Sequence, residues 1–348
     1  MTQRTLRIAA WMMILAIVAP VAFASNPDRT GTAGATELTI PVGGRGVALG
    51  GSYMVFASGV DALYYNPAGL SGQTNGVEAE VSSMNYIADI GVVYGALGVK
   101  TGDFGNLGFS IKAINFGSIV QTTDDFPDGN GQTYSPTFIT MGVTYSKALT
   151  DRIAFGFTAN LVTERILEMS ASGASFDIGL QYKNLGVQGL DLAVAVKNIG
   201  PSMTFAGSNL LTTATSATGN RGAQNYSINA ASFDLPSLME IGLVYTKKFG
   251  EANAVTIGGM FRNNNYLDDE YNLGGEYGFN NNFFIRGGYT FSPQAATDLA
   301  GASSYIYDYS LGVGVHYPVG DVDLTLDYGY RHQKYFTGSN VISLKIGF

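Results

Sequence analysis

Few side chains in this sequence are of the kinds that carry catalytic chemistry. The 348 residues include two histidines, His316 and His332, and no cysteine. Neither histidine stands in an evident arrangement with a serine and a carboxylate, as nucleophilic hydrolases require. Zinc sites draw mainly on Cys and His ligands, which this chain nearly lacks. We therefore expect a protein that is not an enzyme and that holds no metal and no cofactor.

Charged side chains are the remaining candidates for a site. Asp308, Asp323 and Asp327 could together bind a cation. Cationic residues such as Arg262 and Arg286 occur in similar surroundings, and a buried charge is stable mainly when it is paired. Internal ion pairs are therefore the favoured interpretation of these residues.

The composition limits the class of protein. Charged residues make up 13% of the chain, about half the usual share of roughly 25%. The 46 glycines disfavour a helical bundle or a TIM barrel, and the net charge of −8 disfavours nucleic-acid binding. After residue 24 no apolar stretch has the roughly 20 residues of a spanning helix. A low-charge chain rich in glycine and aromatic residues predicts a membrane β-barrel.

The first 24 residues have the anatomy of a secretory signal peptide. Arg4 and Arg7 precede an apolar run, residues 8–21, that ends in the small-x-small sequence at residues 22–24. A permanent anchor helix is the less favoured alternative, because the run is short and contains Pro20. We expect cleavage after Ala24.

The elements that position the charges are predicted by two-residue alternation, the period of a β-strand. The clearest run is Tyr305 to Tyr317, in which Tyr, Leu and Val alternate with Asp, Ser, Gly and His. A soluble sandwich would expose its charged face to water, but here the apolar faces are rich in Tyr and Phe and the opposite faces in small residues. That difference favours a barrel with lipid outside. The charged residues that the pattern assigns to the lumen include Lys112, Glu164, Asp177, Arg262, Arg286, Asp308 and Asp327.

The fold class predicted is all-β, a transmembrane antiparallel barrel of about 14 strands that occupies residues 77–348. The expected strands are 77–87, 90–100, 106–117, 135–147, 153–165, 172–183, 190–198, 237–248, 254–264, 268–277, 282–291, 305–317, 322–332 and 339–348. Short turns follow the even-numbered strands, and several long loops follow the odd-numbered ones. Because short turns face the periplasm in such barrels, we expect both chain termini there.

Residues 25–76 do not alternate and predict a compact N-terminal plug that contains a short helix. We expect Ser58 or Asp61 to cap this helix, which ends at Tyr65 because Asn66 precedes Pro67. The glycine cluster at residues 43–51 lacks the ending of a phosphate-binding loop. Its glycines are expected to permit close packing or positive φ angles instead.

Two N-terminal segments carry a family resemblance. The sequence from Gly43 to Gly51, followed by that from Ala62 to Leu70, resembles the N-terminal signature of the PorV/PorQ family, which belongs with the FadL-like outer-membrane barrels. The similarity extends over about residues 40 to 205. It implies a hatch element at Asn66, Pro67, Ala68 and Gly69, approached by the plug glycines Gly43, Gly46, Gly50 and Gly51.

The resemblance implies one of two functions in the outer membrane of a Gram-negative bacterium. The main expectation is a PorV-like barrel that binds or shuttles type IX secretion cargo, with a translocon or the C-terminal domains of the cargo as partners. The alternative is a FadL-like channel for hydrophobic compounds such as long-chain fatty acids, which would leave through a kink at Gly105, Gly108 or Gly117. Membrane lipid is a partner in both cases, and nucleic acid in neither.

Overall fold

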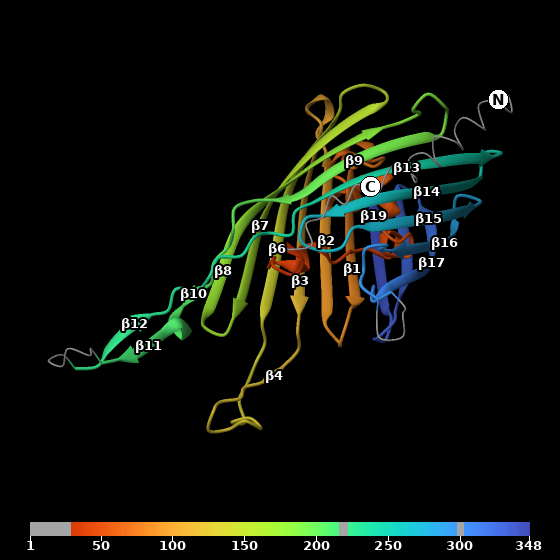
Figure 1. The fold of residues 1–348 in the computed structure, drawn as a ribbon. Coiled ribbons are helices and arrows are strands. Elements are labelled where there is room, and N and C mark those ends of the chain that lie inside the picture. The colour runs from red at the N-terminus through yellow and green to blue at the C-terminus, as the bar shows by residue number, and fades with distance from the viewer. Residues whose placement is uncertain (1–28, 216–221, 298–302) are drawn as a thin grey trace.

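The computed structural model describes residues 29–215, 222–297 and 303–348, so the predicted signal peptide lies outside the described residues. Fourteen strands form one antiparallel wall, which closes where β8 pairs with β9 (Figure 1). Around the barrel the strands follow in the order β8 (Met169–Tyr182), β7 (Ile153–Ile166), β6 (Thr137–Ala148), β3 (Asn106–Asn115), β2 (Gly91–Lys100), β1 (Val77–Asn85), β19 (Ser339–Gly347), β18 (Val322–Gln333), β17 (Tyr307–Val319), β16 (Phe283–Phe291), β15 (Glu270–Phe279), β14 (Asn253–Asn264), β13 (Leu238–Phe249) and β9 (Leu190–Ile199). The predicted fold class and strand count are confirmed.

The two faces of the wall differ as the alternation predicts. On β17, Leu311 is 55% exposed and Val313 is 52% exposed. Ser310, which points to the opposite face of the same strand, is 2% exposed. Lys147, Arg165 and Lys247 lie on the outward face, but each is within three residues of the end of its strand. The outer wall at mid-height is therefore a continuous apolar surface of the kind that lipid covers. No helix in the described parts of the chain has the length and apolarity needed to cross a membrane.

The connections at the two ends of the barrel differ in length. At one end the wall strands are joined by turns of at most seven residues, such as 183–189. At the other end, long connections 116–136 and 200–237 carry two short hairpins that project beyond the wall (Figure 1). These hairpins are formed by β4 (Ile119–Val120) with β5 (Thr133–Tyr134) and by β11 (Leu211–Ala214) with β12 (Gln224–Ser227). The first and last wall strands pair along β1 and β19, and both the start of β1 and the end of β19 lie at the short-turn end.

The barrel wall is interrupted at a place that the sequence analysis did not predict. The third wall strand, β3, pairs with β2 and β6 without a register shift, so the expected kink at Gly105, Gly108 or Gly117 is wrong. Gly108 instead leaves room for the side chain of Leu63 inside the barrel. Register shifts occur between β8 and β9 and between β17 and β18.

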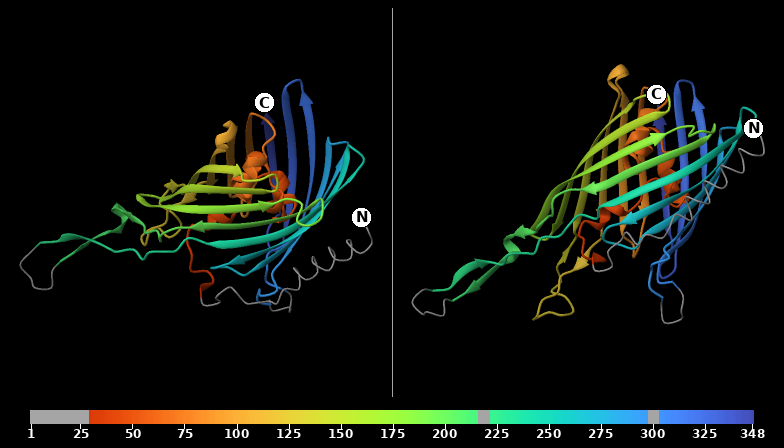
Figure 2. Two further views of the ribbon diagram at one scale, coloured as in Figure 1. Left: turned by 90° about the horizontal axis from the view of Figure 1, so that it is seen from above. Right: turned by 45° about the horizontal axis from the view of Figure 1, so that its top comes forward.

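The N-terminal segment lies inside the barrel, between the strands of the wall, as the two views of Figure 2 show. It forms short helical turns only: η2 (Thr36–Thr39), α2 (Gly44–Ala48), η3 (Ser52–Val55), η4 (Gly59–Asp61), α3 (Ala62–Tyr65) and η5 (Pro67–Gly72). Its largest apolar cluster includes Tyr53 and Met54, which are 0% exposed and contact wall residues Val244 and Met260. The plug is therefore held by burial of apolar surface in the lumen rather than by its own secondary structure.

The short helix ends as predicted but begins differently. Asn66 has extended backbone and ends α3, because Pro67 follows it. Neither Ser58 nor Asp61 makes a side-chain capping hydrogen bond, so that prediction is wrong. The Asp61 carboxylate instead accepts hydrogen bonds from Tyr53 and Lys345.

Candidate functional site

The hatch element is a tight turn that joins two helical segments. Asn66 ends α3 and also caps η5, because its Oδ1 accepts a hydrogen bond from the Ala68 N–H at 3.2 Å. Its Nδ2 donates to the carbonyl oxygen of Leu180 on β8 at 3.4 Å. Pro67 occupies the first turn of η5, where its missing N–H costs nothing. One asparagine thus fixes both the turn and its attachment to the wall.

The wall is shaped to receive this turn. Gly156 on β7 and Gly179 on β8 lie directly opposite each other in the strand register. A Cβ atom at Gly156 would collide with the backbone of Pro67, and one at Gly179 would collide with the side chain of Asn66. Gly69 is equally restricted, because a Cβ there would meet a carbonyl oxygen of the plug. The hatch therefore rests on a flat patch of wall that only glycine provides.

The four plug glycines serve two purposes. Gly43, Gly50 and Gly51 have φ angles of 72°, 61° and 89°, the left-handed region that favours glycine. Gly46 has no positive φ, but a Cβ there would overlap the ring of Tyr65. The predicted roles of these glycines, positive φ and close packing, are both present.

An ionic network ties the plug to the opposite wall. Arg45 on α2 forms a bidentate pair with Glu276 on β15, with N–O distances of 2.9 and 2.8 Å. Arg286 on β16 donates to Glu276 at 2.6 Å and also to Asp327 on β18. Arg262 forms a separate cluster with Glu240 at 2.7 Å. Such pairs offset the cost of burying charge in the lumen.

A second ionic contact joins the plug to the last strand. Lys345 Nζ lies 2.7 Å from Asp61 Oδ2, and the Tyr53 hydroxyl donates to the same oxygen at 2.8 Å. Burial alone would disfavour the carboxylate, but the charge and hydrogen bond of Lys345 outweigh it and lower the pKa of Asp61 to about 2. Asp61 is therefore ionised at neutral pH.

The remaining predicted lumen charges lie around the start of the plug. Lys112 Nζ donates to the carbonyl oxygen of Glu37 at 2.8 Å and more weakly to those of Leu38 and Ile40. The Glu37 side chain is 4% exposed and faces Glu164 on β7. Burial and then the charge of Glu164 raise the pKa of Glu37 to about 7. These contacts hold the segment around η2 against the wall.

Two predicted residues have different surroundings from the rest. Asp177 on β8 accepts hydrogen bonds from the Asn160 side chain at 2.9 Å and from the Asn198 N–H at 2.7 Å. Asp308 lies at the β17 register shift and bonds to His332, whose ring stacks on the exposed ring of Tyr309. Asp308 is thus placed at the rim and apart from the lumen network.

The histidines do not assemble a site. His316 Nδ1 lies 3.0 Å from the Thr325 hydroxyl, at the short-turn end of the barrel. Among the residues that the structure describes, no cluster of His, Asp and Glu has the make-up of a metal site.

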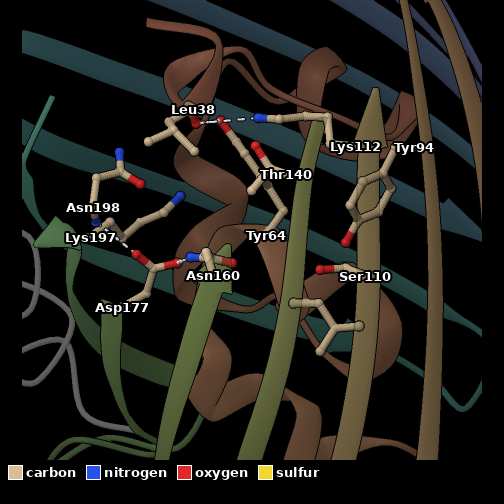
Figure 3. Close-up of a pocket in the computed structure, with 11 residues that line it drawn as sticks. Leu38, Tyr64, Tyr94, Ser110, Lys112, Thr140, Asn160, Asp177, Lys197 and Asn198 are labelled. Carbon is tan, nitrogen blue, oxygen red and sulfur yellow. Dashed lines mark hydrogen bonds between the residues drawn. The ribbon is translucent and has the colours of Figure 1, made fainter. Parts of the chain in front are cut away.

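A small polar cavity lies where the plug meets β2, β3, β6, β7, β8 and β9 (Figure 3). Its volume is about 30 Å³, enough for about two water molecules and too small for a benzene ring. Tyr64 from α3 projects into it, with Lys112 Nζ 4.8 Å and Lys197 Nζ 4.1 Å from its ring centroid. Tyr64 and the cavity hydroxyls lay outside the predicted site. The only feature of the sequence that could have pointed to Tyr64 was its position two residues before Asn66.

The interruption between β8 and β9, which we call the seam, adjoins this region. The two strands pair only as far as Phe176 and Ile199, and the next pairing of β8 on that side is with β10 (Ala206–Gly207) at Met169 and Ser170. Between these points β8 is flanked by the segment 200–205, in which Gly200 adjoins Ala174 and Met203 adjoins Gly173. An apolar cluster covers the seam; it consists of Ala35, Leu38, Val162, Ala171, Met203 and Leu235. The start of the plug thus lies behind a break in the wall.

Comparisons with known proteins address the fold. No protein-family sequence model matches the chain, and no curated protein matches it in sequence. Among solved structures, the toluene transporter TbuX of Ralstonia pickettii matches with a TM-score of 0.55 at 13% identity, covering 88% of this chain and 98% of that chain. The present chain shares the fold of TbuX.

Two further solved structures support the same conclusion. The toluene transporter TodX of Pseudomonas putida gives a TM-score of 0.52 at 14% identity, covering 88% of this chain and 97% of that one. A Pseudomonas aeruginosa FadL homologue gives 0.51 at 13% identity, covering 88% and 98%. The expected FadL-like architecture is therefore confirmed, whereas nothing in the comparisons points to the PorV/PorQ family in particular.

Proposed function

We propose that this protein is an outer-membrane channel for hydrophobic small molecules. The observation that carries the proposal is the combination of an apolar outer wall, a lumen filled by the chain's own N-terminal segment, and an apolar seam in the wall behind that segment. A water-filled pore would need an open polar lumen, which a filled barrel does not provide. The shared fold of the toluene transporters and the FadL homologue is consistent with this proposal.

The route we propose runs sideways through the seam. An apolar molecule that enters from the long-loop end would gain nothing by crossing the ionic network beneath the plug, because burying apolar surface against charges is unfavourable. Through the seam it would move from Ala35 and Leu38 to Met203 and then to lipid, remaining among apolar groups throughout. We also propose that the short-turn end, with both ends of the barrel chain, faces the periplasm.

The type IX secretion role receives no support from the comparisons. The two strands of the projecting hairpin, β11 and β12, are exposed at every residue, as a protein-binding arm would be. Exposure alone does not identify a cargo domain as its partner, so we favour the channel.

A disulfide across the seam tests the proposed route. A Cβ built at Gly173 on β8 lies 2.6 Å from Met203 Cγ, so cysteines at these two positions are close enough to bridge. The chain has no other cysteine. We expect the G173C/M203C variant, expressed in a Gram-negative host without its own channel for such compounds, to take up labelled toluene or oleate only after reduction.

The controls separate the route from general damage. Each single variant, G173C or M203C, should take up the probe with or without reductant. Uptake by the oxidised double variant equal to that by the reduced one would overturn the seam as the route. No uptake by the wild-type protein of any hydrophobic probe would overturn the channel itself.

A further inference from the structure

Tyr64 differs from its neighbours in the plug. Ala62, Leu63 and Tyr65 on the same helical turn are buried, whereas Tyr64 is only partly buried and faces the polar cavity. Its hydroxyl donates to the Leu38 carbonyl oxygen at 3.3 Å, a long hydrogen bond. The Tyr64 ring is thus held mainly by the groups that lie next to its π face.

Two buried ammonium groups approach that ring from different strands. Lys112 on β3 and Lys197 on β9 are each 5% exposed, and both lie within 5 Å of the ring centroid. Lys112 also binds backbone carbonyls. Among the described residues, Lys197 has no hydrogen-bond acceptor. It is attracted by the more distant charges of Glu240 and Asp177 and repelled by that of Arg262. The attraction between its ammonium and the Tyr64 ring is therefore its closest stabilising contact.

Two hydroxyl groups in the same cavity also lack partners. Tyr94 Oη and Thr140 Oγ1 are buried, and no described residue bonds to either. A buried hydroxyl without a partner costs free energy, so this cavity is suited to a guest with a polar atom. Figure 3 shows Lys112, Lys197 and Thr140 around Tyr64, and the Tyr94 hydroxyl pointing toward Ser110 in the same cavity.

We propose that this cavity selects phenols, and that the side chain of Tyr64 occupies the place of the guest in the closed protein. This inference rests on the proposed channel function and names its substrate class. When Tyr64 swings aside, a phenolic ring takes its position beside the ammonium groups of Lys112 and Lys197. The guest hydroxyl binds the Leu38 carbonyl oxygen or the free hydroxyls of Tyr94 and Thr140.

Other small rings satisfy the cavity only in part. A saturated ring has no π face and leaves the Lys197 ammonium without a partner. Toluene has the π face but leaves the two hydroxyls unpaired. Because displacing Tyr64 has a cost, a guest binds only if it restores the contacts that Tyr64 gave up. Phenol should therefore bind best, toluene less well and cyclohexanol least.

Ligand-observed NMR on the purified full-length protein in detergent tests this order. The probes are phenol, toluene and cyclohexanol, each measured against the wild type and three variants. We expect Lys197→Met to reduce the preference for phenol over cyclohexanol roughly tenfold, because without the ammonium neither Tyr64 nor a phenolic guest gains the cation–π contact that a saturated ring lacks. Lys197→Arg keeps a cation over the ring and should restore the preference. Lys247→Met removes a cation that lies 5.1 Å from the Phe249 ring on the outer wall, and should change nothing.

A second variant keeps the test valid if Lys197→Met does not fold. Thr140→Val removes a hydroxyl that has no partner, so it should fold, and it should reduce the preference for phenol over toluene. Equal binding of phenol and cyclohexanol, or an unchanged preference in both variants, would overturn the inference. Uptake of toluene by cells with no phenol preference in the purified protein would leave the channel function intact and remove only this inference.

Discussion

At the scale of single residues, the wall glycines beneath the hatch decide whether the plug can seat. Gly156 and Gly179 leave no space for a methyl group, because the backbone of Pro67 and the side chain of Asn66 occupy it. Overpacking of this kind forces backbone shifts that cost about 1–3 kcal/mol. These two positions were invisible to sequence analysis, since their partner segment lies more than 80 residues away in the chain.

We expect Gly156→Ala to destabilise the folded barrel by about 1–3 kcal/mol. The measurement is the urea midpoint of unfolding, followed by the gel mobility of folded and unfolded barrel. Gly287→Ala is the matched control, because the nearest atoms to a Cβ there are 3.8 Å away. Equal midpoints for the two variants would contradict the close contact between hatch and wall.

The pair of Asp61 and Lys345 should contribute more to stability than an exposed pair. Asp61→Asn leaves the Lys345 ammonium without its carboxylate in a largely buried site, which costs about 3 kcal/mol. Asp234→Asn removes the partner of Arg29, where both side chains are more than 40% exposed, and should cost less than about 1 kcal/mol. The same urea midpoints measure both changes.

The Asp61 pair also predicts a response to acid. The pKa of Asp61 is lowered in the folded protein from its usual 3.8 to about 2. Its contribution is therefore complete above about pH 4 and is lost as the pH falls toward 2. Asp61→Asn should lack this part of the acid dependence. An identical loss of stability in the variant and the wild type between pH 4 and 2 would exclude Asp61 as its source.

At the scale of elements, the first segment of the plug should respond to pH near neutrality. The pKa of Glu37 in η2 is raised from 4.5 to about 7, so the docked segment holds a proton that the undocked segment releases. Docking is then strongest below about pH 4.5 and weakens as the pH rises toward 7. Lys112 and Glu164 are the charged wall residues that face Glu37.

Hydrogen exchange of the amides at residues 36–42 measures this effect. We expect protection of these amides to fall between pH 5 and 7 after correction for the intrinsic exchange rate. Glu37→Gln should remove the pH dependence and keep the segment docked, because the amide cannot ionise. Unchanged protection of the wild-type segment across this range would show that Glu37 does not control docking.

The elements also show where sequence analysis succeeds and fails. Strand positions follow from alternation, because lipid on one side and a filled lumen on the other constrain every second residue; the predicted 322–332, for example, is observed as Val322–Gln333. The end of α3 at Asn66 was also predicted, because Pro67 restricts the backbone of the residue directly before it. Asp61 was expected to cap a helix, but its partner is Lys345, 284 positions away.

At the scale of the whole molecule, the barrel and its plug form one packed unit. A kink was expected at Gly105, Gly108 or Gly117, yet β3 is regular and Gly108 makes room for Leu63 of the plug. The seam lies between β8 and β9 instead. To predict an irregularity in the wall, one must know which strands pair and where the plug packs. Neither follows from the alternation within a single strand.

The orientation of the apolar wall toward lipid supports every functional conclusion above. Single cysteines at Leu311, Val313 and Leu326 place a spin label on the outer wall, and one at Thr213 places it on the projecting hairpin. Collision with oxygen and with a water-soluble nickel chelate should be measured for each label in lipid bilayers. We expect the three wall labels to collide often with oxygen and rarely with nickel, and the label at Thr213 to collide often with nickel. Nickel access to the wall labels equal to that at Thr213 would show that this wall does not face lipid.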